Sequence, residues 1–283
     1  MTTTAVTPSS APPAATPQRS AAYWALRDTL TITGRNLTTL RRVPQLLVFS
    51  TIQPILFVVM FRYVFGGEIT IPGVGNYVDY LMPGIFAQTV AFGALTTGIG
   101  LSEDLGKGLI ERFRSLPMAR SAVLAGRTLA DLCRNVFVVA LMVGVGVLVG
   151  FRIHRGVLPF LGGLALLLLF GFALSWVFGI VGLSVPNAET AQAAAFPLIF
   201  PLVFASSAFV RVDNMPGWLQ AFAENQPVTA TVNAVRALCL DSATAERLIG
   251  ASTGELVLRS LAWSLGILAV AAPLAVRRYR RVA

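Results

Sequence analysis

Six stretches of this chain contain no charged residue and are long enough, or nearly so, to cross a bilayer as an α-helix. Such a crossing takes roughly 20 mostly apolar residues. The segments between these stretches carry the arginines and carboxylates. The pattern therefore predicts an all-α polytopic membrane protein with six transmembrane helices, at residues 43–61, 80–102, 135–151, 157–183, 190–210 and 260–276.

The segment before the first apolar stretch, residues 20–42, has apolar residues at helical spacing. Tyr23, Leu26, Leu30 and Leu37 follow this spacing, and several arginines accompany them. Such a pattern is typical of an amphipathic helix that lies in the membrane interface. A polar tether with chance spacing is the alternative interpretation.

A second amphipathic pattern follows the second apolar stretch. Residues 102–104 read Ser-Glu-Asp, which favours a helix start because serine caps the first turn and the acids complement the helix dipole. Pro117 disfavours helix at the residue before it. Gly106 and Gly108 weaken the first turn, so the helix could instead begin near Gly108. We predict a short surface helix that meets either lipid headgroups or a groove on a soluble partner. Its apolar stripe would be Leu105, Leu109, Phe113 and Leu116.

The segment between the last two apolar stretches, residues 211–255, is too long for a plain connector. Pro216 and Pro227 each precede a run of apolar residues at helical spacing, and proline is favoured at the start of a helix. We predict two short helices in this last outer loop, which form either a structural lid or a gate for a substrate. The candidate gate residues are Trp218, Phe222, Asn225, Gln226 and Pro227.

Composition supports a membrane protein. Hydrophobic residue types make up 55% of the 283 residues and charged types only 12%, whereas soluble domains carry about 25% charged residues. The net charge of +9 could indicate nucleic-acid binding, but the sequence has no soluble domain to carry a basic face. The first long apolar run begins at Val43 and no small-residue cleavage site follows it, so it is not a signal peptide.

The distribution of basic residues predicts the orientation in the cell (plasma) membrane. Arginines concentrate before the first span, in the 103–134 loop and at residues 277–281, and six crossings place all three on one side. The positive-inside rule makes that side the cytoplasm. Arg152 and Arg155 do not fit this orientation, since they would lie in an outer loop, but the three larger basic clusters outnumber them. The predicted domains are a disordered tail (1–19), the interfacial helix (20–42), a transmembrane domain (43–276) with a cytoplasmic loop (103–131) and an outer loop (211–255), and a basic cytoplasmic tail (277–283).

Patterns for catalysis or metal binding are weak. Cys133 and Cys239 have no metal-ligand spacing, and the single histidine, His154, has no Gly-x-Ser-x-Gly nucleophile motif with it. Ion-coupled carriers bury ionisable residues at mid-membrane. Here every charge is expected at or beyond the span ends, with Arg62 and Arg259 the deepest. Asp131 and Arg134 are one turn apart and are expected to form a local pair at the start of the third span. A secondary carrier or channel that is not coupled to ATP remains one alternative function.

A pathway without buried charge would be apolar with scattered hydroxyls and amides. Such a pathway suits an apolar, bulky or amphipathic substrate, such as a hydrophobic antibiotic or a lipid. Helix packing is the other interpretation of each polar residue within a span. The candidate pathway residues are Thr96, Thr97, Ser175, Gln192, Ser206 and Ser207.

Residues 108–131, GLIERFRSLPMARSAVLAGRTLAD, resemble the cytoplasmic loop of ABC-2 type transporter permeases. The outer segments MPGWLQ and NQPVTATVNAVRAL, together with GFRIHRG, are similar to the daunorubicin-resistance branch of that family. The resemblance covers nearly all of residues 20–283. The positions that match the family pattern are Gly108, Glu111, Arg112, Pro117, Arg120, Gly126 and Arg127.

The resemblance implies that the chain is the membrane permease subunit of an ABC exporter. Two permease subunits form the pathway in such an exporter, either as a homodimer or as a heterodimer with a paralogue. Two separate ATPase subunits dimerise on ATP, and each holds one coupling helix. A Walker A motif needs Gly-Lys-Ser/Thr, but the only lysine, Lys107, precedes a glycine. The chain is therefore expected to bind no cofactor itself, with ATP and magnesium on the partner. The implied coupling residues are Gly108, Leu109, Glu111, Arg112, Phe113, Arg114, Leu116 and Pro117.

Overall fold

The computed structural model describes residues 21–42, 45–64, 74, 76–108 and 120–282. All regular secondary structure in these residues is helical, which confirms the all-α prediction. The α-helices are α1 (Ala21–Arg42), α2 (Gln45–Val59), α3 (Tyr77–Gly106), α5 (Arg120–Val149), α6 (Val157–Gly182), α7 (Ala188–Phe204), α8 (Gly217–Glu224), α9 (Pro227–Cys239), α10 (Ser242–Ile249) and α11 (Thr253–Val282). A π-helical turn, η1 (Met60–Val64), continues α2, and a 3-10 turn, η2 (Val212–Asn214), precedes α8.

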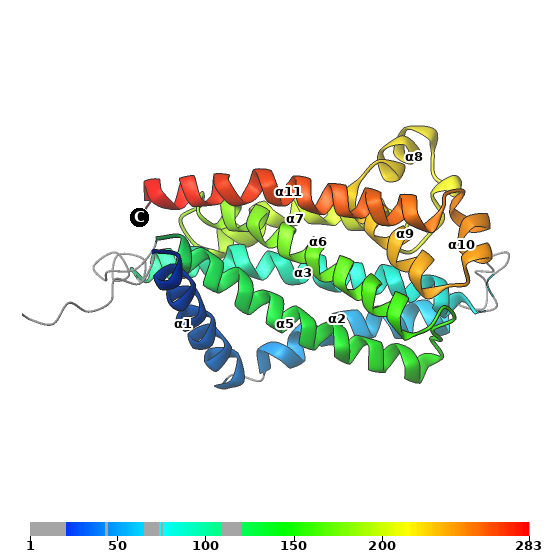
Figure 1. The fold of residues 1–283 in the computed structure, drawn as a ribbon, viewed down its shortest axis with the longest axis horizontal. Helices are drawn as coiled ribbons and strands as arrows, with labels where there is room; N and C mark the ends of the chain where they lie inside the picture. Colours follow the sequence, from blue (N-terminus) through cyan, green and yellow to red (C-terminus); the bar gives the residue numbers. More distant parts are fainter. Residues whose placement is uncertain (1–20, 43–44, 65–73, 75, 109–119, 283) are drawn as a thin grey trace, which may run out of the picture.

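The long helices run side by side along the longest axis of the molecule (Figure 1). Helix α1 crosses this bundle near the end where α11 finishes, and α8 and α10 lie at the opposite end. We call these the α1 end and the cap end. Helix α3 is central, since it packs against α5, α6, α7 and α9 and is buried over most of its length.

Four helices are long and apolar enough to cross a membrane, at Tyr77–Gly106, Ala122–Val149, Val157–Gly182 and Thr253–Val282. They coincide with four of the six predicted spans. The other two predicted spans correspond to shorter apolar helices, at Ser50–Val64 and Ala188–Phe204. Helix α7 ends at Phe204, before the predicted end of its span at residue 210.

Glycines bring α3 and α6 into direct backbone contact. A Cβ atom on Gly98 would collide with the Phe178 carbonyl oxygen, and one on Gly182 would collide with the Gly98 carbonyl oxygen. Small residues at such crossings let membrane helices approach closely, which increases their van der Waals contact. These two glycines therefore fix α3 and α6 as the centre of the bundle.

Helix α1 is unbroken from Ala21 to Arg42, as the helical spacing predicts. One face packs against α5, where Ile32 and Thr33 are buried and the Thr33 hydroxyl donates to the Gly126 carbonyl at 3.1 Å. The apolar residues at its start remain exposed: Tyr23, Trp24, Leu26 and Leu30. An exposed apolar face beside exposed arginines suits a helix that lies in a membrane surface.

The two predicted helices of the last loop are present. Helix α8 begins directly after Pro216, and α9 has Pro227 in its first turn. A third helix, α10, was not predicted. Its Asp241 cap accepts a hydrogen bond from the Thr244 backbone at 3.4 Å, and Gly250 ends it in the left-handed conformation at φ 73°.

The predicted helix start at residues 102–104 is wrong. Helix α3 continues through these residues to Gly106, and Ser102 is fully buried within it. The helix can continue past the charged residues because Asp104 forms an ion pair with Arg127 of α5, at 2.5 Å. The basic residues at the C-terminus likewise belong to α11, which continues to Val282.

Candidate functional site

A polar cavity lies at the α1 end, where α3 finishes and α5 begins. Its volume is about 450 Å³, and residues of α1, α2, α3 and α5 line it. Its walls contain an ion pair between α3 and α5, Asp104 to Arg127 at 2.5 Å, and an exposed pair at the end of α3, Glu103 to Lys107 at 3.3 Å. We call it the entrance cavity. Its lining includes Lys107, and the described chain is interrupted two residues later, at residues 109–119.

The implied coupling helix falls almost entirely on those residues. Of its candidate residues, only Gly108 is described, and it leaves α3 with a φ of 65°, a conformation that glycine adopts without strain. The backbone amide of Gly108 donates to the Leu105 carbonyl at 3.0 Å. The coupling helix therefore stays a prediction.

Charged residues also lie on helix α5, on the turns before its charge-free stretch. Asp131 and Arg134 are inside Ala122–Val149 and form the predicted local pair, at 3.8 Å. The Thr97 hydroxyl donates to Asp131 at 2.5 Å, and Arg134 donates to the Gly93 carbonyl at 2.6 Å. These partners compensate the loss of water, so both charges can sit within the bundle.

A second cavity continues from the entrance cavity into the bundle. Its volume is about 270 Å³, and it lies between α2, α3, α5 and α7. The two cavities share Ser50, Thr96 and Arg134 in their walls. We call it the inner pocket. Amide side chains are prominent in its lining, which includes Gln53, Gln88, Asn135 and Gln192.

Two of the six candidate pathway residues, Thr96 and Gln192, line the inner pocket together. The other four do not. Their hydroxyls are used within the fold: Thr97 to Asp131 at 2.5 Å, Ser175 to the Gly171 carbonyl at 3.0 Å, Ser206 to the Val203 carbonyl at 2.6 Å, and Ser207 to Asn233 at 2.9 Å. Thr96 also bonds within the fold, to the Gly93 carbonyl at 2.8 Å, so the role of all six in a pathway stays a prediction.

The cap end contains a fully buried arginine, Arg236, which is 1% exposed. Its guanidinium donates to the Tyr80 carbonyl at 3.1 and 3.2 Å, to the Ser207 carbonyl at 2.9 Å and to the Asn233 side chain at 2.9 Å. The guanidinium carbon also lies 3.6 Å from the centre of the Tyr80 ring. Sequence analysis missed this residue, because a single arginine in a segment predicted to be a loop gives no sign of burial.

The candidate gate residues separate into two groups. Trp218 is 77% exposed on α8, and Phe222 and Asn225 are exposed near it. Gln226 is buried instead, and its amide donates to the carbonyls of Leu202 at 2.7 Å and of Ala205 at 3.1 Å. Gln226 therefore joins the end of α7 to the start of α9, where Pro227 begins the helix.

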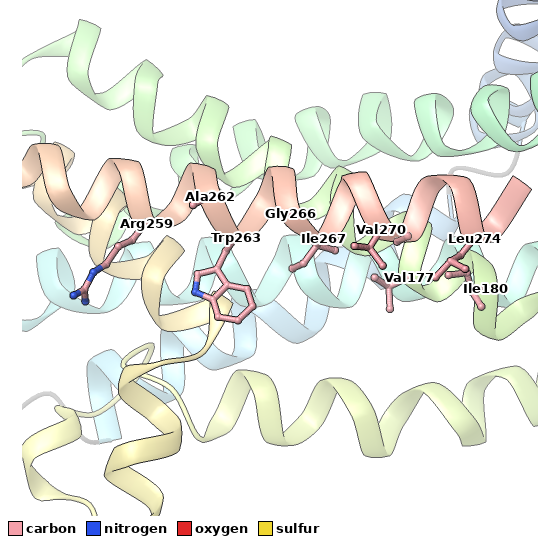
Figure 2. Close-up of a pocket in the computed structure, with 10 residues that line it drawn as sticks. Val177, Ile180, Arg259, Ala262, Trp263, Gly266, Ile267, Val270 and Leu274 are labelled. Atoms are coloured by element: carbon pink, nitrogen blue, oxygen red, sulfur yellow. The ribbon is translucent and has the colours of Figure 1, made fainter.

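An apolar groove lies on the outside of the bundle between α6 and α11, with a volume of about 750 Å³. Figure 2 shows Arg259 at one end and Trp263, Ile267, Val270 and Leu274 following it along α11. Apart from Arg259 and the indole of Trp263, its lining offers only hydrocarbon. That lining suits contact with lipid chains, so the inner pocket is the stronger candidate for selective binding.

Long apolar helices, with a polar cavity that reaches between them from one end, define a multi-pass helical membrane protein. The sequence model of the ABC-2 type transporter family matches residues 27–240, and the chain belongs to this family.

Several curated relatives match over most of the chain. The daunorubicin resistance ABC transporter permease protein DrrB1 of Streptomyces coeruleorubidus is 35% identical over 263 residues, which cover 93% of this chain and 89% of the relative. The probable doxorubicin resistance ABC transporter permease protein DrrC of Mycobacterium tuberculosis (strain ATCC 25618 / H37Rv) is 29% identical over 265 residues, 93% of this chain and 92% of the relative. DrrB of the same strain, a doxorubicin resistance ABC transporter permease protein, is 30% identical over 226 residues, 74% of this chain and 78% of the relative.

The chain is therefore the membrane permease subunit of an ABC exporter. Permeases of this family carry no ATPase domain, so ATP is hydrolysed on a separate partner subunit.

Proposed function

We propose that this permease exports hydrophobic or amphipathic drugs of the kind named for its relatives, daunorubicin and doxorubicin. The substrate would leave the cytoplasm or the inner leaflet. The observation that carries the proposal is the inner pocket, which opens to the α1 end through the entrance cavity and contains both hydrogen-bonding and aromatic side chains. Lipids are the second substrate class that such a lining could accept.

The proposed topology has six crossings, by α2, α3, α5, α6, α7 and α11, with both chain ends in the cytoplasm. One observation supports it. The α1 end holds the last turns of α11, where Arg277, Arg278, Arg280 and Arg281 are exposed. Basic residues favour the cytoplasmic side. The cap end would then face outward, with α8 as a lid that carries Trp218 and Phe222.

The proposed coupling runs from the partner ATPase through residues 108–117 to the bundle. Two permeases, as a homodimer or with a paralogue, would each engage one of two ATPase subunits. The ion pair between Asp104 and Arg127 supports this route, because it joins the end of α3 to the start of α5 on either side of the coupling segment. A displacement of that segment would act on both helices together.

Export can be tested by producing the permease together with its partner ATPase in drug-sensitive bacteria. We expect cells loaded with daunorubicin to lose the drug severalfold faster than cells that hold the permease with a partner whose Walker A lysine is replaced by alanine. A secondary carrier would instead empty the cells after ATP depletion as long as a proton gradient remains. Equal efflux with both partners would refute ATP-driven drug export.

A further inference from the structure

The apolar groove and a polar cavity at the cap end meet at one residue, Arg259. This arginine lines both the groove between α6 and α11 and the polar cavity, whose volume is about 380 Å³. Residues of η2, α8, α9, α10 and α11 line the polar cavity, which we call the cap cavity. A hydrocarbon groove that joins a polar cavity matches an amphipathic molecule with a long apolar part and a compact polar head.

The groove is long enough to hold an acyl chain that crosses one leaflet. Figure 2 shows its residues in a row along α11, from Arg259 to Leu274. An α-helix rises about 1.5 Å per residue, so this row is roughly 22 Å long. The hydrocarbon of one leaflet is about 15 Å thick, half of the bilayer core. Val270 and Leu274 in this row are 61% and 46% exposed, so their surfaces are available to a chain.

Trp263 marks the level at which the groove meets the polar side of the membrane. It lies one turn of α11 from Arg259 and is 43% exposed. Tryptophan is enriched where the hydrocarbon of a membrane meets the headgroups, because its ring is apolar and its N–H is polar. The row from Trp263 to Leu274 would therefore lie in hydrocarbon, with Arg259 and the cap cavity at the level of the headgroups.

Opposite charges lie side by side where the groove meets the cap cavity. The Arg259 guanidinium is 3.1 Å from the Glu255 carboxylate, and these side chains are 61% and 49% exposed. A second ion pair, Arg211 with Asp213, also lines the cap cavity. Exposed ion pairs contribute little to stability, so a ligand can share both partners of the first pair. A guanidinium has five N–H donors, and one contact to Glu255 leaves most of them available.

These pairs favour a head that carries both charges. A phosphate would accept hydrogen bonds from Arg259, and a primary ammonium would donate to Glu255. Glu224 adds a further carboxylate to the cap cavity. An anionic head would gain from Arg259 but would be repelled by the neighbouring carboxylates. The hydrocarbon lining of the groove does not select among chains, so selectivity would come from this charged end.

We propose that a zwitterionic phospholipid with a primary ammonium, a phosphatidylethanolamine, binds with one acyl chain in the groove and its head between Arg259 and Glu255. The lipid belongs to the leaflet at the cap end. Among the described residues, the groove shares no lining residue with the inner pocket or the entrance cavity. The lipid site is therefore separate from the proposed drug pathway and does not depend on which drug is exported.

Native mass spectrometry of the purified permease–ATPase complex counts the lipids that it retains and gives their Kd values on titration. We expect phosphatidylethanolamine to bind severalfold more tightly than phosphatidylglycerol, which is anionic, or phosphatidylcholine, which has no N–H donor. Arg259→Gln should raise the Kd of phosphatidylethanolamine about tenfold, because one charge-assisted hydrogen bond is lost. Arg247→Gln, at an exposed arginine of α10 outside both cavities, is the matched control and should leave the Kd unchanged.

Glu255→Gln distinguishes lipid binding from a structural role of the ion pair. This variant should bind phosphatidylethanolamine severalfold more weakly, because the ammonium loses its charged acceptor. It should bind phosphatidylglycerol more tightly, because Arg259 becomes free for the anion. An ion pair that only supports the helix would change the unfolding temperature and leave the lipid preference as it was.

The groove itself can be filled without a collision. Gly266 lies in its lining, and a Cβ atom there would meet nothing within 4 Å. We therefore expect Gly266→Phe to fold and to lose the retained phosphatidylethanolamine. Gly162→Phe introduces the same residue on α6, at a glycine that also has nothing within 4 Å and lies outside the groove. It should retain the lipid as the unmodified chain does.

A second measurement needs none of these variants. Ala262 and Leu258 are both exposed on α11, but only Ala262 lines the groove. In a Cys133→Ser background in phosphatidylcholine nanodiscs, added phosphatidylethanolamine should slow maleimide labelling severalfold at Ala262→Cys. Labelling at Leu258→Cys should not change.

Equal Kd values for the three lipids, or full retention of phosphatidylethanolamine by folded Gly266→Phe, would overturn the inference. A Gly266→Phe complex that keeps its lipid but loses a permease copy would also refute it, because a second copy would then cover the groove. If the variants of Arg259 and Gly266 fail to fold, the labelling decides alone. Protection of Ala262→Cys by phosphatidylethanolamine supports the inference, and unchanged labelling refutes it.

Discussion

Arg236 carries the largest electrostatic cost among the single residues described at the cap end. It has no ion-pair partner in the described part of the chain, and it is compensated by three oxygen acceptors and the face of the Tyr80 ring. Hydrogen bonds from a charged donor contribute about 1.5–3 kcal/mol each. Through them Arg236 fastens α9 to the start of α3 and to the turn after α7.

Replacing this arginine tests that role. Arg236→Met should destabilise the protein by about 2 kcal/mol, because the charge-assisted hydrogen bonds to the buried Tyr80 and Ser207 carbonyls would be lost. Arg236→Lys should be nearly as damaging, since an ammonium cannot reproduce the planar fork. Thermal unfolding of the purified protein measures both. Arg247→Met, at an exposed arginine of α10, is the control, and equal unfolding temperatures for all three variants would contradict the assignment.

Residue roles of this kind could not be predicted from the sequence. The main partner of Arg236, the Tyr80 carbonyl, lies 156 positions away in the chain. The same holds for Asn135, whose surroundings depend on glycines in other helices. Sequence spacing does predict local pairs, and Asp131 with Arg134 is confirmed because both lie one turn apart on a single helix.

At the scale of elements, charge-free windows predict helices well and their ends poorly. Four predicted spans coincide with long apolar helices. The third span was predicted to begin at residue 135, but α5 begins at Arg120. The difference arises because charged residues do not by themselves end a helix: Arg127 pairs with Asp104 of α3, and Asp131 pairs with Arg134 on α5 itself. Helix α10 was missed because its short sequence is largely polar.

The contact between α1 and α5 depends on Gly126. A Cβ atom there would lie 2.7 Å from the Ile32 side chain, whereas Gly144, on the same helix, has nothing within 4 Å. We expect Gly126→Val to detach α1 and make trypsin cleavage at Arg27 and Arg35 severalfold faster. Gly144→Val introduces the same residue in open space and should leave the cleavage rate unchanged. Equal rates for the two variants would show that α1 is held elsewhere.

The predicted coupling helix is tested by charge reversal. Glu111→Lys should either release the ATPase subunit from the purified complex or leave ATP hydrolysis running without drug efflux, while the permease still inserts into the membrane. Co-purification and ATPase activity measured beside efflux separate these results. Glu189→Lys, at an exposed position in the first turn of α7, is the control. Normal efflux by the Glu111 variant would count against docking at this segment.

At the scale of the whole molecule, the proposed topology predicts which positions can be reached from each side. Cys239 cannot report on it, because the residue is fully buried and burial raises the pKa of its thiol to about 12. With Cys133 replaced by serine, Trp218→Cys should react with an impermeant maleimide added to intact cells. Ser184→Cys, exposed at the other end of the bundle, should react only after the membrane is opened. Reaction of both cysteines in intact cells would refute the six-crossing topology.

The backbone contact between α3 and α6 limits how the pocket can change during a transport cycle. Two helices that touch through Gly98 and Gly182 cannot slide past each other without a collision, so they move as one rigid body. The walls supplied by α2 and α7 contain Pro54, Pro197 and Pro201, each of which removes a helical hydrogen bond and allows the helix to bend. Helix α3 also contains a proline, Pro83, but it lies 15 residues before the contact with α6 at Gly98. The pocket would therefore open and close as α2 and α7 bend, while α3 and α6 stay in place.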